Sequence, residues 1–170
     1  MKYLLRSTSK SLPTGRQGFT LIEILIVIGI IAILAAIVII AINPAKQFAQ
    51  ARNTQRESNV NTILNAIGQN VADNKGVFTC PGVTLPTATP GAVGTGGVNL
   101  GAATCLVPTY IPTAIPMDPG GTVGGVTVVA GTPADTGYTV QVDAVGRVTV
   151  CAPNHAESAI PGAAAYCLTR

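Results

Sequence analysis

The stretch that decides the fold of this chain is Gly18-Phe19-Thr20-Leu21-Ile22-Glu23. It leads directly into Ile24–Ile42, which carries no charge over 19 residues. As a helix these residues rise about 28 Å at 1.5 Å per residue, close to a bilayer core of about 30 Å. We therefore expect residues 19–43 to form a membrane-spanning helix.

Glu23 lies near the start of this apolar run. A carboxylate inside a membrane helix costs about 2.5–3.5 kcal/mol on insertion scales, which makes it a candidate functional residue. One reading places Glu23 at the membrane interface, hydrated and without a role. We favour a second reading, in which it pairs with an amine, because a matched pair offsets part of the cost of a lone charge. Such a pair would fix the stagger between neighbouring helices.

Positive charge is concentrated ahead of the apolar run. Four bases and no acid precede Phe19, whereas six bases and seven acids follow from that residue onward. This asymmetry predicts a cytoplasmic N-terminus and an external head. The net charge of +3 thus belongs to the leading segment, and no nucleic-acid partner is expected.

Residues 1–18 are typical of a leader that is removed. The segment Ser7–Gly18 is polar and contains Pro13 and Gly15. An ordinary secretory signal carries its apolar region before the cleavage site. Here the polar-to-apolar boundary is Gly18/Phe19, so cleavage at that point would leave the apolar helix on the mature chain.

A second, amphipathic helix half is expected over residues 44–76. Pro44 predicts a kink or local unwinding, since proline disfavours helical geometry in the residue before it. Beyond it, apolar residues recur at helical spacing, namely Val60, Ile63, Leu64, Ile67 and Val71. This stripe should pack against the head, and Gly76 should end the helix. We expect Arg52, Arg56 and Glu57 to form a solvated or intersubunit face.

Residues 77–170 are expected to form a small, loop-rich head. Residues 77–124 are rich in Pro, Gly and Thr and predict a long loop, with one short strand near Leu106–Tyr110. Strand patterns follow at 125–130, 138–142, 147–151 and 166–169. The fold class is therefore α+β, with a long N-terminal helix packed on a small antiparallel sheet.

All four cysteines lie in the predicted external head. An even number of cysteines in a small exported domain predicts two disulfides. Three pairings are open, and we favour Cys80–Cys105 with Cys151–Cys167 because each closes a local loop. None of the four has the spacing of a zinc site.

The head shows no cluster of residues that predicts catalysis or a cofactor. His155 is the single histidine, and we expect it in a surface turn. Asp118, between Pro116 and Pro119, is the one calcium candidate, with Asp135 and Asp143 the nearest acids of that region. Calcium takes six to eight oxygens, so no metal site is predicted.

Residues 15–42 resemble the N-terminus of type IV pilins and of the pseudopilins of type II secretion systems. Tyr110-Ile111-Pro112, the segment 115–119, Tyr138 and the hairpin at Gly146 also resemble pseudopilin heads. Many family members carry a proline slightly nearer the helix start than Pro44, which leaves the position of any unwinding open.

This resemblance implies a pilin-like fold and a prepilin with a class III signal peptide. A membrane-embedded prepilin peptidase would cut after Gly18, and the new amino group of Phe19 would be methylated. An inner-membrane assembly platform would then stack the subunits into a helical homopolymer. In it, Glu23 would pair with the Phe19 amine of a neighbouring copy.

Three functions follow from these features. The first is a structural subunit of a type IV pilus-like filament. The second is a pseudopilin or minor pilin of a secretion or DNA-uptake machine. The third, a single-pass anchored enzyme or binding domain, would require a site in residues 77–170, and we find none there. We expect no enzymatic activity, an inner-membrane precursor, and a head in the periplasm or at the cell surface.

Overall fold

The computed structural model describes residues 18–102 and 104–170. Most of the expected leader, residues 1–17, therefore lies outside the described residues. The chain divides into two compact units, one ending at Ile42 and the other spanning Asn43–Arg170. Each unit is described by itself.

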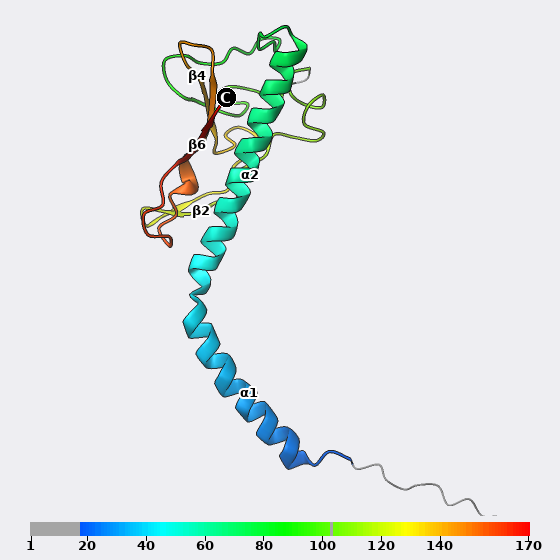
Figure 1. Cartoon of the computed structure of the whole chain (residues 1–170), viewed down its shortest axis with the longest axis vertical. Coiled ribbons are helices and arrows are strands. Elements are labelled where there is room, and N and C mark those ends of the chain that lie inside the picture. Colours follow the sequence, from blue (N-terminus) through cyan, green and yellow to red (C-terminus); the bar gives the residue numbers. More distant parts are fainter. Residues whose placement is uncertain (1–17, 103) are drawn as a thin grey trace, which may run out of the picture. The chain divides into compact units, whose positions relative to one another are not determined.

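The described part of the first unit contains one helix, α1 (Leu21–Ile42), shown in blue to cyan in Figure 1. None of its 22 residues is buried. It is long and apolar enough to cross a membrane by length and composition. Isoleucine and valine are only moderate helix formers in water, but in lipid every backbone group must bond within the segment, which favours a helix.

The second unit begins at Asn43 and continues as α2 (Pro44–Asp73). Asn43 adopts a left-handed conformation, with φ 47° and ψ 80°, and its side chain accepts a hydrogen bond from the Lys46 amide at 3.3 Å. Pro44 occupies the first helical position, where its missing N–H has no intrahelical role. The kink or local unwinding predicted at Pro44 is observed as an interruption of the helix at one residue, Asn43.

The C-terminal end of α2 is closed by a Schellman motif. The Gly76 amide donates to the Val71 carbonyl at 2.8 Å, and Lys75 takes the left-handed position with φ 59°. Gly76 follows with φ 90°. The sequence predicted the helix end correctly, but the first left-handed residue is Lys75.

Four antiparallel strands form the main sheet in the order β1-β4-β5-β6. They are β1 (Gly91–Ala92), β4 (Thr139–Val142), β5 (Val148–Ala152) and β6 (Tyr166–Thr169). A separate hairpin pairs β2 (Gly121–Val123) with β3 (Val126–Val128). A long helix followed by an antiparallel sheet confirms the predicted α+β, pilin-like class.

Two details of the strand prediction need correction. Residues Leu106–Tyr110 form turns, because the Leu106 carbonyl accepts both the Tyr110 and the Ile111 amides at 2.9 Å. Conversely, β1 and β2 lie in the stretch predicted as loop. Both are two or three residues long and begin with glycine, so neither produces a recognisable alternation.

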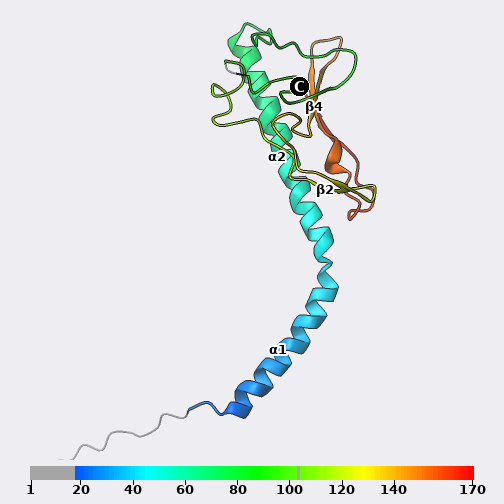
Figure 2. The ribbon, with the colours of Figure 1, turned by 180° about the vertical axis from the view of Figure 1, so that it is seen from behind.

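The core lies between α2 and the main sheet, which lie side by side in both views (Figures 1 and 2). Val60, Ile63, Leu64 and Ile67 are buried as predicted, and Val71 is partly buried at the edge. Across from them are buried side chains of the sheet and of the loop before it, namely Leu100, Leu106, Tyr138, Val140 and Val150. The helix packs directly on β5 and β6.

Two disulfides fasten the loops around this core. Cys80 bonds to Cys105, and Cys151 bonds to Cys167. These are the local pairs favoured from the sequence. The second joins opposite residues of β5 and β6 and closes the loop that contains η1 (Pro153–His155).

Candidate functional site

The residues around the expected cleavage point lie just outside α1. Thr20 caps the helix, since its hydroxyl accepts the Glu23 amide at 3.2 Å and its carbonyl accepts the same amide at 3.1 Å. Gly18 and Phe19 precede that cap and are exposed. A Cβ built at Gly18 would meet nothing within 4 Å. The peptide bond between them is thus accessible to another protein.

Glu23 occupies the first turn of α1, where the helix dipole favours negative charge. Within residues 18–102 and 104–170, no ion pair involves its carboxylate. The first turn of a helix stabilises an acid only modestly, by about 0.3–1 kcal/mol at an exposed site. That is less than the cost of placing a charge in lipid, so the helix end alone would not offset such a cost.

The side chains of α1 present apolar surface on every face of the helix. Phe19 and the large apolar residues of α1 are all among the exposed hydrophobics, and Ile40 is 84% exposed. A soluble monomer rarely exposes so large a continuous apolar surface. Lipid or further copies of the helix must therefore cover it.

A group of charged and polar side chains is buried in the second unit and centres on Arg56. This residue is 0% exposed, and its five guanidinium N–H groups all find acceptors. Nε and Nη2 donate to the two oxygens of Asp118 at 2.8 and 3.1 Å, and Nη1 donates to Glu157 at 2.8 Å. The remaining donors bind the Asn53 side chain and the Gly120 carbonyl.

Glu157 links this cluster to a second arginine. Its carboxylate accepts hydrogen bonds from Arg52 at 2.7 and 2.9 Å and from the Thr122 amide at 3.1 Å. Burial alone would raise the pKa of Glu157, but the hydrogen bonds from Arg52, Arg56 and Thr122 outweigh it and lower the pKa to about 2. Two guanidinium groups thus balance two carboxylates, which lets four charges remain in and beside the core.

The expectation of a solvated face at Arg52, Arg56 and Glu57 was wrong for Arg56. Arg56 lies four residues before Val60 and seven before Ile63, so it shares the buried stripe of α2. That spacing was a signal in the sequence. Arg52 is partly exposed, with 30% of its side-chain surface accessible, and Glu57 lies nearer solvent.

The structure does not support the calcium hypothesis for Asp118. Both of its oxygens face Arg56, and Oδ1 also accepts the Gly120 amide at 2.7 Å. Asp143 pairs with Arg147 at 2.7 Å, away from this site. Among the described residues, no group of three His, Cys, Asp or Glu side chains could hold a metal ion.

His155 fastens the disulfide-closed loop to α2. Its Nε2 lies 3.1 Å from Glu57 Oε1, and its backbone carbonyl accepts a hydrogen bond from the Asn53 side chain at 2.9 Å. Ser158 Oγ donates to the Thr122 carbonyl, and Cys151 is disulfide-bonded. These partners give His155 a positioning role and no adjacent nucleophile in the part of the chain described.

Comparison with known proteins matches the N-terminal region. The prokaryotic N-terminal methylation motif matches residues 14–39, as in type IV pilins and pseudopilins. No curated protein and no solved structure matches the chain. The motif and the apolar helix indicate a membrane-anchored precursor that carries the N-terminal signal found in type IV pilins and pseudopilins.

We predict that Arg56→Met destabilises the head by about 3–5 kcal/mol, because it leaves Asp118 and part of Glu157 buried without a counter-charge. Urea unfolding of the purified full chain in detergent measures this loss. Arg52→Met is the matched control. It should cost clearly less, because Arg52 is partly exposed and Glu157 keeps Arg56 as a partner. Equal losses for the two variants would contradict the central role of Arg56.

The low pKa of Glu157 also predicts how stability depends on pH. Its folded pKa of about 2 lies below the ordinary value of 4.5, so its contribution is present above pH 4.5 and is lost as pH falls towards 2. This contribution is on the order of 3 kcal/mol. The free energy of unfolding should therefore fall more steeply in wild type than in Glu157→Gln between about pH 5 and pH 2. Parallel curves would show that Glu157 titrates normally.

Proposed function

We propose that this chain is the precursor of a structural subunit that polymerises through α1 into a type IV pilus-like filament. Cleavage between Gly18 and Phe19 frees the Phe19 amino group, which is then methylated. The observation that carries the proposal is the uncovered apolar helix, which begins two residues after the scissile bond within a matched methylation motif. Stacking copies of α1 buries that surface when the subunit leaves the membrane.

Cleavage creates the cation that Glu23 lacks. An uncut chain has an amide at Phe19, whereas the cut chain has a protonated amine four residues before Glu23. In an apolar surrounding, the amine of one copy and the carboxylate of another stabilise each other, and each alone carries a desolvation cost. Only copies with the correct axial stagger make this pair. The ion pair that fixes the stagger can therefore form only after the leader has been cleaved. N-methylation keeps the positive charge of the amine.

The second unit supplies an exported head. Its two disulfides suit an oxidising compartment outside the cytoplasmic membrane. The positive leader is expected to hold the N-terminus in the cytoplasm until the peptidase acts. Partners in this scheme are further copies of the chain, the peptidase and an inner-membrane assembly platform.

A pseudopilin of a type II secretion system is the second candidate. The segment 115–119 and the hairpin at Gly146 favour it, because both resemble pseudopilin heads. Both functions use the same N-terminal chemistry. Long surface filaments would support the pilus, and short filaments that support secretion would support the pseudopilus.

We predict that Gly18→Arg blocks processing, because a long charged side chain displaces the scissile bond in the peptidase. Displacing reacting groups by about 1 Å lowers a reaction rate by about 100-fold. A gel of membranes from cells that contain the peptidase separates precursor from mature chain. Gly18→Ala is the control and should be cut, although more slowly. Normal cleavage of Gly18→Arg would remove the assignment of the cut.

We predict that Glu23→Ala is inserted and processed normally but assembles poorly. A loss of roughly 1.4 kcal/mol per contact corresponds to about a tenfold lower filament yield. Sheared filaments from matched cell numbers, compared by immunoblot with the membrane pool, give that yield. Ile26→Ala, which removes apolar surface but no charge, is the control. A wild-type yield from Glu23→Ala would refute the role of the ion pair.

A further inference from the structure

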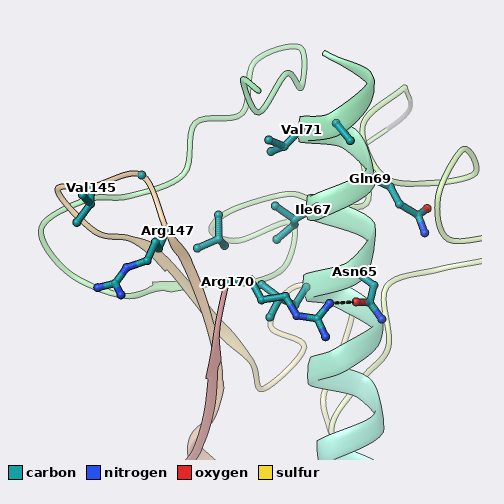
Figure 3. A pocket seen from close by; sticks show the side chains of 12 residues that line it. Asn65, Ile67, Gln69, Val71, Val145, Arg147 and Arg170 are labelled. Atoms are coloured by element: carbon teal, nitrogen blue, oxygen red, sulfur yellow. Dashed lines mark hydrogen bonds between the residues drawn. The ribbon is translucent and has the colours of Figure 1, made fainter. Parts of the chain in front are cut away.

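A groove of about 530 Å³ lies between the C-terminal part of α2 and the turn that joins β4 to β5 (Figure 3). Leu64, Ile67 and Val148 are buried side chains that line it. Gly68 widens the helix side, because a Cβ built there would meet nothing within 4 Å. Val145 stands at the turn and is 79% exposed. The groove is therefore apolar and open to a partner.

The rim of this groove is positively charged. Arg147 and Arg170 are the only bases in the sequence after Lys75, and both line it. None of the lining residues is acidic. Arg147 is tethered to the adjacent Asp143 at 2.7 Å, whereas Arg170 is held by the uncharged Asn65 amide (Figure 3). Arg170 thus presents a positioned cation that has no acidic partner among the described residues.

A complementary feature is the loop 129–135, which follows β3. Val129 is 80% exposed at its start, and Pro133, Ala134 and Asp135 are exposed at its end. Thr95 and Gly96 donate backbone hydrogen bonds to the carbonyls of Pro133 and Ala134, at 2.8 and 2.9 Å. The loop is therefore held in one conformation and would lose little entropy on docking.

Among the acids of residues 77–170, Asp135 is the one that forms no ion pair with another described residue. Asp118 and Glu157 pair with arginines inside the head, and Asp143 pairs with Arg147. The carboxylate of Asp135 binds only the Gly137 amide, at 2.9 Å, among the described residues. Its exposed charge matches that of Arg170.

We infer that the groove of one head receives the loop 129–135 of the next copy in the filament, with Asp135 of that loop facing Arg170. The inference rests on the proposed function, because it needs a polymer. The groove and the loop share no residue, so the contact is heterologous. A heterologous contact that does not close into a ring propagates as a helix, which suits a filament and not a dimer.

Photo-crosslinking in filaments tests this contact directly. A benzoylphenylalanine at position 145 places the probe on an exposed residue of the β4–β5 turn that lines the groove. We expect a covalent dimer whose cross-linked peptide, identified by mass spectrometry, contains residues 129–135. Wild-type-like filaments that give no dimer, or a dimer cross-linked elsewhere, would overturn the inference.

A charge exchange provides the second test. Arg170→Glu and Asp135→Arg should each lower the cross-link yield about threefold, the scale of an exposed ion pair. The double variant should recover most of it. Lys75→Glu makes the same charge change outside the lining residues and should have no effect. Failure of the double variant to recover, with all variants folded, would refute the pairing.

These outcomes are distinct from failure of the proposed function. If Glu23→Ala removes filaments while the groove variants change nothing, only the head contact is wrong. If the wild-type chain forms no filament under any condition that supports processing, both proposals fall together.

Discussion

The constraint on which this protein depends is that α1 is apolar on all sides and that no described part of the chain buries it. A helix of this kind is stable only in lipid or among its own copies. Under the proposed function, the precursor uses the first environment and the polymer the second, so the same surface serves anchoring and assembly. In the function proposed above, charge separates the two states, because Glu23 finds its cation only after a new amine has been made.

In the head, buried ion pairs join segments that are far apart in the sequence. Arg56 is fully buried on the stripe of α2 that also carries the aliphatic core. It binds Asp118 from the loop before β2 and Glu157 from the disulfide-closed loop, which ties two distant segments to one helix. Removing one partner of a buried ion pair is costly, whereas replacing the whole pair by apolar residues of similar volume is often neutral. His155 and Asn53 add two contacts between the same loop and α2.

Much of the fold was predictable because its signals are local. Periodicity predicted α2 to within three residues at its C-terminal end, and the strand signals predicted β4, β5 and β6 to within one. The arginine cluster was not predicted, since Arg56 is 62 residues from Asp118 and 101 from Glu157. No local pattern reports a contact over that distance, although the helical spacing of Arg56 with Val60 did indicate a buried position. The short strands β1 and β2 were missed because tertiary pairing, not propensity, makes them.

The most direct test of the central claim is the intact mass of the protein taken from assembled filaments. We expect the mass of residues 19–170 with one added methyl group and four hydrogens fewer, as two disulfides require. That single value reports the cut, the modified amine and the oxidised head together. A mass that still includes Met1, or a processed chain found only as a monomer, would contradict the claim that cleavage creates the charge on which assembly depends.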